Sequence, residues 1–379
     1  MRSSRTGRAG FAAVALAAGM LAVAGCAGHP AVVSAATASA TARTTRAGSA
    51  PATATPRALP TPGTQPGQRI VGLTLDNPSL TVTTAGLYLT WYRTRPNGSV
   101  TGVTIVRADA ATGVIAARRD LAAGLPGVPL LADGSLWVTD STPGRGRLLR
   151  LNPATLAVTG SVSVGGVGQT GRPGQVAYAG DAIWLDGGGL LVRVAPASMT
   201  VALTITFPGA DDSSVGASPD GAVLVVAETR DGVGAVQRRD PVTGAVLASS
   251  ATDGVISPAI AGVTDGGVWL ATPTGMMGFI ERLAASSLSP VQSTRVGGTN
   301  GIRADVADGA LWVTDPVGGG AKNYCADPVT GRVRAASPLP DPGQDQLLAV
   351  GPSLLYYTAF DASANGWRIA TAPVPAACA

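Results

Sequence analysis

Histidine is almost absent from this 379-residue sequence, in which His29 is the only one. Residues 69–379 therefore contain no histidine, which excludes histidine-based catalytic triads, histidine general bases and zinc sites with histidine ligands from that stretch. Charged residues make up 13% of the chain and aromatic residues 4%, whereas Gly (51) and Pro (28) are abundant. This composition argues against a helical bundle or coiled coil, and it favours many short strands joined by tight turns.

Lysine is also nearly absent, and the basic charge that arginine supplies is unevenly placed. Residues 1–68 contain six arginines and no acidic residue, whereas residues 69–379 contain 21 basic and 23 acidic residues. The net charge of +4 thus comes from the N-terminal part of the chain. Residues 69–379 show no excess of basic charge for a nucleic-acid surface, and no nucleic-acid partner is expected.

Residues 1–25 have the features of a bacterial lipoprotein signal peptide. Three arginines within the first eight residues precede an apolar run over 11–24, which is short for a membrane span. The run ends in a motif that resembles the lipobox, Val23-Ala24-Gly25-Cys26. The resemblance implies export, cleavage before Cys26 and attachment of acyl chains such as palmitate, which would hold the protein in the bilayer on the extracytoplasmic side of the cell membrane. An ordinary signal peptide with an incidental cysteine is the alternative.

Residues 26–68 are predicted to be a disordered tether that starts at the lipidated Cys26. Ala, Thr, Pro, Gly and Ser occupy 33 of the 42 positions from 27 to 68, with no acidic or aromatic residue. Such a segment buries too little apolar surface to offset the entropy cost of ordering. As a flexible coil it would span roughly 35 Å.

A repeated motif organises residues 69–379, at an average spacing of about 44 residues. Each copy has a turn, a small residue, an aliphatic residue, a large residue and further strand-forming residues. The predicted large-residue positions are Tyr88, Trp137, Trp184, Leu224, Trp269, Trp312 and Leu355. A second motif, typified by Asp240-Pro241-Val242-Thr243-Gly244, follows most copies and is typical of a hairpin turn.

Two hairpins in about 44 residues correspond to four short strands, which is one propeller blade. Seven copies need about the length that 69–379 supplies, so we predict an all-β domain, a seven-bladed β-propeller of four-stranded blades. Six or eight blades, or a pair of β-sandwiches, are the alternatives. Motifs such as Ser218-Pro219-Asp220-Gly221 and Leu136-Trp137-Val138 resemble the YVTN, NHL and streptogramin-lyase-like propeller repeats. The tryptophans are interpreted as packing between blades and not as a cofactor-stacking site.

The chain ends are expected to close the ring. The last repeat is one strand short, and Arg69–Leu75 is predicted to supply that strand. Cys325 and Cys378 lie in the last two repeats, and in an oxidising compartment we predict a disulfide between them. Two free thiols, or a metal site formed by two cysteines, are the alternatives.

Four carboxylates follow the large residues at similar offsets and form the candidate ligand rim: Asp140, Asp186, Glu228 and Asp315. In a propeller these positions lie where the second strand of a blade ends, near a face that often binds ligands. The rim is a candidate site for calcium, a cationic ligand or a basic partner. Turn capping and solubility are the alternative explanation.

The favoured function is binding or scaffolding of an envelope protein or a cell-wall ligand, by a monomer without a predicted cofactor. Streptogramin-lyase activity is disfavoured because that family uses histidine with a metal. A quinone-dependent dehydrogenase is disfavoured because this sequence lacks the tryptophan docking motif of that family. A hydrolase of the lactonase type, with calcium and carboxylates, is the enzyme alternative.

Overall fold

The computed structural model describes residues 66–378 apart from 96–99, 123–124, 143–144, 166, 168–173, 188, 231–232, 253–258, 275–276, 297–302, 308, 316–321, 339–345 and 362–365. The predicted signal peptide, Cys26 and almost all of the predicted tether lie outside the described residues. Every named element in the described part of the chain is a β-strand. No helix with the length and apolarity of a membrane span occurs in that part.

The strands are β1 (Thr74–Thr83), β2 (Gly86–Thr94), β3 (Val100–Ala108), β4 (Ile115–Ala122), β5 (Leu125–Pro126), β6 (Leu130–Ala132), β7 (Ser135–Thr142), β8 (Arg145–Leu151), β9 (Val158–Ser163), β10 (Val176–Ala179), β11 (Ala182–Gly187), β12 (Leu190–Ala195), β13 (Thr200–Thr206), β14 (Ala210–Ala217), β15 (Leu224–Arg230), β16 (Val233–Arg239), β17 (Val246–Thr252), β18 (Ala259–Thr264), β19 (Gly267–Thr274), β20 (Met277–Leu283), β21 (Pro290–Val296), β22 (Arg303–Ala307), β23 (Ala310–Asp315), β24 (Lys322–Ala326), β25 (Val333–Pro338), β26 (Gln346–Val350), β27 (Leu354–Asp361) and β28 (Gly366–Pro373).

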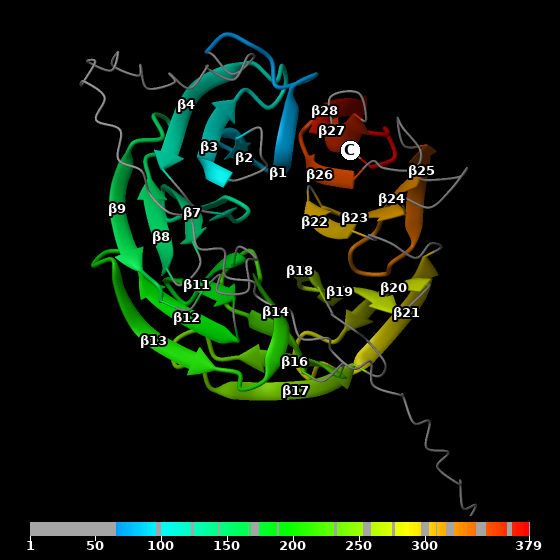
Figure 1. Cartoon of the computed structure of the whole chain (residues 1–379). Coiled ribbons are helices and arrows are strands. Elements are labelled where there is room, and N and C mark those ends of the chain that lie inside the picture. Colours follow the sequence, from blue (N-terminus) through cyan, green and yellow to red (C-terminus); the bar gives the residue numbers. More distant parts are fainter. Residues whose placement is uncertain are drawn as a thin grey trace, which may run out of the picture. The chain divides into compact units, whose positions relative to one another are not determined.

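These strands form antiparallel sheets in which neighbours along the chain pair with each other (Figure 1). Four sheets have four strands each: β10–β13, β14–β17, β18–β21 and β22–β25. Strands β5–β9 form a further sheet, in which both β5 and β6 pair with β7. The predicted all-β class and the predicted four-stranded unit are confirmed.

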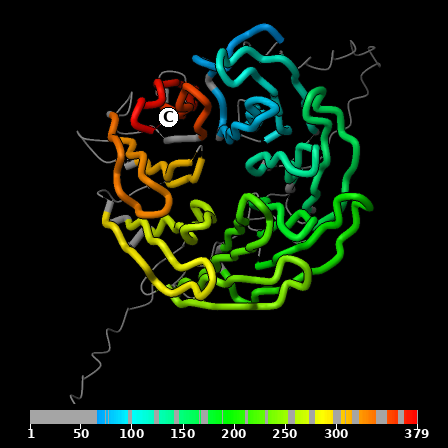
Figure 2. The backbone as a smooth tube through the Cα atoms, turned by 180° about the vertical axis from the view of Figure 1, so that it is seen from behind, coloured from blue at the N-terminus to red at the C-terminus, as the bar shows by residue number. Residues whose placement is uncertain are grey.

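The sheets follow one another around a ring (Figures 1 and 2). Inner strands of successive sheets contact each other: β10 contacts β14, β14 contacts β18, β18 contacts β22 and β22 contacts β26. Strand β26 also contacts β1, which belongs to the same sheet. The remaining sheet, of seven strands in the order β26-β27-β28-β1-β2-β3-β4, joins the end of the chain to its beginning.

Side chains of the second strand in each unit fill the space between successive sheets. Because side chains alternate along a strand, one face of β11 presents Ile183 and Leu185 while the other presents Trp184. The first two pack with Trp137 of β7, and Trp184 packs with Leu224 of the next sheet. The predicted packing role of Trp137, Trp184, Trp269 and Trp312 is confirmed, since all four are buried between sheets.

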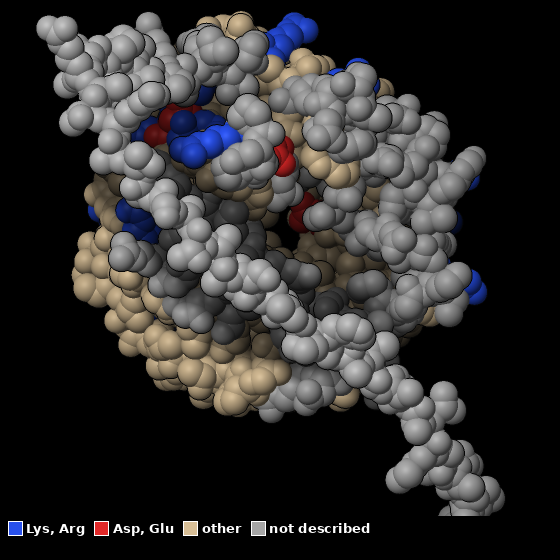
Figure 3. All heavy atoms as spheres, in the orientation of Figure 1, with Lys and Arg blue, Asp and Glu red and all other residues tan. Residues whose placement is uncertain are grey.

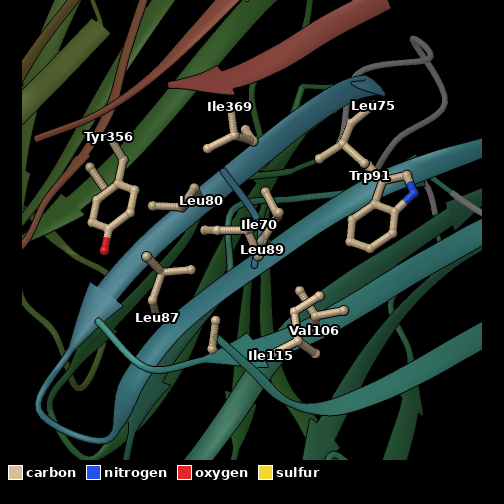
Figure 4. Packing of buried hydrophobic residues seen from close by; sticks show 12 residues of the cluster. Ile70, Leu75, Leu80, Leu87, Leu89, Trp91, Val106, Ile115, Tyr356 and Ile369 are labelled. Atoms are coloured by element: carbon tan, nitrogen blue, oxygen red, sulfur yellow. The ribbon is translucent and has the colours of Figure 1, made fainter. Parts of the chain in front are cut away.

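The predicted position of the large residue is wrong by one residue in two copies. In β15 it is Val225, not Leu224, that packs forward onto the next sheet. In β27 it is Tyr356, not Leu355, that packs with Leu87 of β2 (Figure 4). Neighbouring apolar residues on a strand look alike in the sequence, and a shift of one residue exchanges the two faces of the sheet.

Strand β1 closes the ring by pairing with two strands, β28 from the end of the chain and β2 from its beginning. Thr74 and Leu75 pair with β28, while residues 79–83 pair with β2. The closing role predicted for Arg69–Leu75 is therefore confirmed for its second half. The first half of that segment instead lies beside the start of β4, where Arg69 forms a bridge with Val114.

The predicted disulfide between Cys325 and Cys378 is present, with 6.1 Å between the two Cα atoms. Cys325 lies on β24 opposite Trp312, and Cys378 packs in the same cluster as Trp312. Since β28 is the last described strand, no hairpin of a fourth strand follows it to cover Trp312. The C-terminal segment with its disulfide covers this tryptophan instead.

Candidate functional site

The two faces of the ring differ in the groups that they carry. In each four-stranded sheet the first and second strands, and the third and fourth, are joined at one face, which we call the turn face. The second strands end, and the third strands begin, at the opposite face, which we call the outlet face. The hairpins of the second sequence motif lie on the turn face, and the four carboxylates of the ligand rim lie on the second strands, near the ends that reach the outlet face.

On the turn face, acidic side chains bind the backbone of their own turns. Asp240 Oδ1 accepts hydrogen bonds from the backbone N–H of Val242 (3.0 Å) and Thr243 (2.7 Å) and from the Thr243 hydroxyl (2.9 Å). These donors, the N–H of Thr243 foremost, hold the pKa of Asp240 below its usual range. Asp109 and Asp327 make the same set of bonds, so these carboxylates are part of the turn structure.

The turn keeps its shape even where the sequence motif is degenerate. Gly244 has a φ of 74°, as the motif predicts. In three other sheets the corresponding position also has a positive φ but carries a side chain, at Leu156 (59°), Met199 (53°) and Leu288 (58°). Leu156 and Leu288 are fully buried, so packing of the side chain offsets the strain of the backbone.

Large side chains also tie the turn faces of successive sheets together. Trp269 Nε1 donates a hydrogen bond to the Pro328 carbonyl of the next sheet (2.7 Å). The Tyr88 hydroxyl donates in the same way to the Pro153 carbonyl (3.0 Å). These two turns are therefore held both by their own Asx side chains, Asn152 and Asp327, and by a side chain of the preceding sheet.

Asp140, of the ligand rim, is buried and forms an ion pair with Arg147 across the β7–β8 hairpin. The side chain of Asp140 is 2% exposed and that of Arg147 is 50% exposed. The partner oxygen is Oδ2, and Oδ1 has no hydrogen-bond partner among the described residues. Burial raises the pKa of Asp140, and the hydrogen bond and charge of Arg147 oppose that rise. The buried carboxylate thus holds an exposed guanidinium in place.

Asp186 and Glu228 have other local partners. Asp186 Oδ1 accepts the backbone N–H of Gln175, directly before the first strand of its sheet, at 2.6 Å. Thr139, the corresponding residue of the preceding sheet, accepts the N–H of Gly127 at 2.8 Å, so Asp186 takes the place of a structural threonine. Glu228 Oε1 accepts a hydrogen bond from Gln237 Nε2 at 2.9 Å, while its Oε2 is buried without a hydrogen-bond partner among the described residues.

The three rim carboxylates whose side chains are described, Asp140, Asp186 and Glu228, are not brought together into one metal site. Among the described residues no three His, Cys, Asp or Glu side chains are grouped so that they could hold a metal ion. The side chain of Asp315, at the end of β23, lies outside the described part of the structure, as do the loops that follow the second strands. The described carboxylates therefore have local structural partners, and they are not grouped as a shared metal site would require.

Sequence patterns did not reveal the partners of these carboxylates. Arg147 and Gln237 lie on third strands, and each faces its carboxylate only once the hairpin is folded. A further polar cluster lies on the β1–β4 strands, where Asp120 binds Arg118 (3.0 Å) and the Thr104 hydroxyl (2.7 Å). For Asp140 and Arg147, opposite charges on the two strands of a predicted hairpin are a signal that could have identified the pair, whereas the neutral Gln237 gives no such signal.

Known proteins show similarity to this chain at the level of structure. The chain matches no protein-family model and no curated protein sequence. The WD40 domain of Toxoplasma gondii coronin superimposes with a TM-score of 0.55 at 14% identity, covering 82% of this chain and 85% of that one. The C-terminal WD40 domain of Sif2 gives a TM-score of 0.54 at 13% identity, with 78% and 82% covered.

The fold is a β-propeller. BamB from Moraxella catarrhalis is also similar, with a TM-score of 0.48 at 14% identity, covering 80% of this chain and 99% of that one. At these identities the similarity to the two WD40 domains establishes the propeller architecture alone, and function has to be argued from the residues of this propeller.

Proposed function

We propose that this protein is a lipid-anchored, extracytoplasmic, seven-bladed propeller that binds an envelope protein or a cell-wall ligand as a monomer. Seven blades result when the seven-stranded sheet is counted as two. Strands β26–β28, completed by Thr74 and Leu75, form one blade, and residues 79–83 with β2–β4 form the other. This count equals the number of repeats in the sequence, which supports it.

The proposed anchor rests on the lipobox-like motif that ends at Cys26. Its test is growth of the producing cells with an alkyne fatty acid, followed by fractionation. We expect the label on the wild-type protein in the membrane fraction, and an unlabelled, released protein for Cys26→Ser. A labelled Cys26→Ser protein, or an unlabelled wild type, would contradict the anchor.

The binding role is carried by one observation, the half-exposed Arg147 held by the buried Asp140 at the outlet face. Arginine is enriched at the centres of protein interfaces, and a side chain held in place before binding loses less conformational entropy on association. The turn face contrasts with this, because Asp240 and Asp327 there are bound to their own turns. We therefore assign ligand binding to the outlet face.

Site-specific photo-crosslinking tests this assignment with a matched pair of positions on one sheet. Val233 at the start of β16 lies toward the outlet face, and Val242 lies in a hairpin of the turn face. Their exposed fractions are 58% and 60%, so accessibility is equal. A photoreactive residue is placed at each position in the anchored protein on living cells.

We expect a discrete adduct from position 233, little from position 242, and loss of the adduct when Arg147→Ala is added. Equal adducts from both positions, or an adduct that Arg147→Ala leaves unchanged, would refute binding through this site. Arg332→Ala, which removes an exposed arginine elsewhere on the ring, serves as the control.

A further inference from the structure

Four arginines lie on the β1–β4 part of the ring, three of them at its outer strand β4, in a set that we call the arginine stripe: Arg69, Arg95, Arg118 and Arg119. Arg69 lies against the start of β4, through its bridge to Val114. Arg118 and Arg119 lie on β4, and Arg95 follows the end of β2 at the outlet face. The stripe thus extends from the turn face to the outlet face. Figure 3 shows basic and acidic side chains gathered over this part of the ring.

The stripe is basic in a domain that is acidic as a whole. Residues 66–122 contain six arginines and three acidic residues, whereas residues 210–252 contain three arginines and six acidic residues. Within the stripe only Arg118 is paired with a described acidic residue, Asp120, at 3.0 Å, and Arg95 and Arg119 are exposed. This edge therefore attracts anions, while the sheet β14–β17 repels them.

The N-terminal segment joins the ring at this same edge. The Gly67 N–H donates to the Ile115 carbonyl (2.8 Å), and the Ile115 N–H donates to the Gln68 carbonyl (2.7 Å). The chain thus enters the ring along the free side of β4, next to the stripe (Figure 2). Residues 26–65 add three more arginines and no acidic residue.

We propose that the arginine stripe docks on anionic lipid headgroups, so that the ring stands on the edge formed by β4. This docking rests on the lipid anchor proposed above, because an anchored chain would keep the stripe at high effective concentration near the headgroups. The guanidinium group binds phosphate oxygens in a bidentate manner, and each arginine near an anionic surface strengthens binding.

The test uses the full mature chain, residues 26–379 with Cys26→Ser, so that it does not depend on lipidation. Its partition onto vesicles of phosphatidylcholine mixed with anionic phosphatidylglycerol is compared with its partition onto pure phosphatidylcholine. The test variant is Arg95→Gln/Arg119→Gln. The control is Arg295→Gln/Arg332→Gln, which removes the same charge from exposed positions on other sheets.

We expect binding to the anionic vesicles only, weakened roughly 25-fold in the test variant, since each arginine contributes a factor of about five. The control variant should bind within about twofold of wild type, and added salt should weaken binding of both. Equal loss in the two variants, binding to pure phosphatidylcholine, or binding to a soluble polyphosphate but not to vesicles would overturn the docking. Failure of the lipid anchor itself is seen separately, in the fatty-acid labelling of Cys26.

Discussion

The turn face and the outlet face are built from the same strands, yet their polar groups are used differently. On the turn face, Asp240 and Asp327 accept hydrogen bonds from their own backbone, and Trp269 donates to the turn of the next sheet. On the outlet face, Asp140 is buried with one oxygen unpaired among the described residues, and it holds a half-exposed arginine. The first arrangement uses its polar groups within the fold, and the second leaves a charged group available to a ligand.

This difference separates stability from binding. A change on the turn-face side should lower the free energy of unfolding and leave ligand capture by the folded protein unchanged. A change at the outlet face should lower ligand capture and leave the free energy of unfolding nearly unchanged. The predictions below test whether the two properties separate in this way.

The largest expected effect is that of Trp269→Ala, which removes a buried ring between two sheets and its bond to Pro328. Truncation of a buried tryptophan costs about 4 kcal/mol of unfolding free energy, measured by urea denaturation. Trp269→Phe is the control: it keeps most of the packing and should cost about 1 kcal/mol for the lost hydrogen bond. A fall of less than about 1 kcal/mol for Trp269→Ala would refute the proposed role of this layer.

Removal of the disulfide with Cys325→Ala/Cys378→Ala should cost nearly as much. The bond spans a sequence separation of 53 residues, and the entropy of the loop that it closes corresponds to about 4 kcal/mol. Adduct formation from position 233 by the remaining folded protein should be unchanged. Reduction of the wild-type protein by dithiothreitol should also lower its free energy of unfolding, whereas the stability of the double variant should not change with the reductant.

The sequence predicts the parts of this molecule that depend on local chemistry. The alternation around Trp137 predicts strands, the Asp-Pro-x-Thr-Gly pattern predicts hairpins, and two remaining cysteines predict one disulfide. Contacts that depend on tertiary register are not predictable in this way. Val225 and Leu224 look alike until the sheet is formed, and the bridge between Arg69 and Val114 joins distant residues. At the candidate site the carboxylates were found, but their partners Arg147 and Gln237 depend on the register of each hairpin.

Two glycines of the turn face separate backbone strain from packing. Gly244 and Gly134 both have a positive φ, 74° and 65°. A Cβ at Gly244 would lie 2.7 Å from Ile205 Cδ1, whereas a Cβ at Gly134 would meet nothing within 4 Å. We expect Gly134→Ala to cost about 1 kcal/mol and Gly244→Ala about 2–3 kcal/mol, measured by thermal and urea unfolding. Equal costs would show that the neighbouring side chains adjust freely.

At the outlet face, Asp140→Asn should change stability by only about 1 kcal/mol, because the half-exposed Arg147 can be hydrated when its partner is neutral. Binding should respond more strongly, since Arg147 is no longer held by a charge. We expect a fivefold to tenfold loss of the adduct from position 233, for about 1 kcal/mol of lost preorganisation. A stable variant with full adduct formation would contradict the role assigned to this pair.

The pH dependence of stability distinguishes the two faces by its sign. The pKa of Asp240 is lowered by hydrogen bonds from its turn, so its ionised form stabilises the fold above the ordinary pKa of 3.8, and this contribution is lost as the pH falls through the lowered value. The pKa of Asp140 is raised by burial, so its ionised form is unfavourable above the raised value, and this penalty disappears as the pH falls. Thermal unfolding between pH 7 and pH 2 should therefore show Asp240→Asn less stable than wild type at pH 7, by about 2 °C in Tm, with the difference shrinking as the pH falls below the ordinary pKa of 3.8. For Asp140→Asn, the stability of the wild type relative to the variant should instead rise as the pH falls. If the difference in stability between wild type and variant changed with pH in the same direction for both variants, the ionised Asp140 would be stabilised by Arg147 as fully as Asp240 is by its turn. The contrast between the two faces would then be wrong.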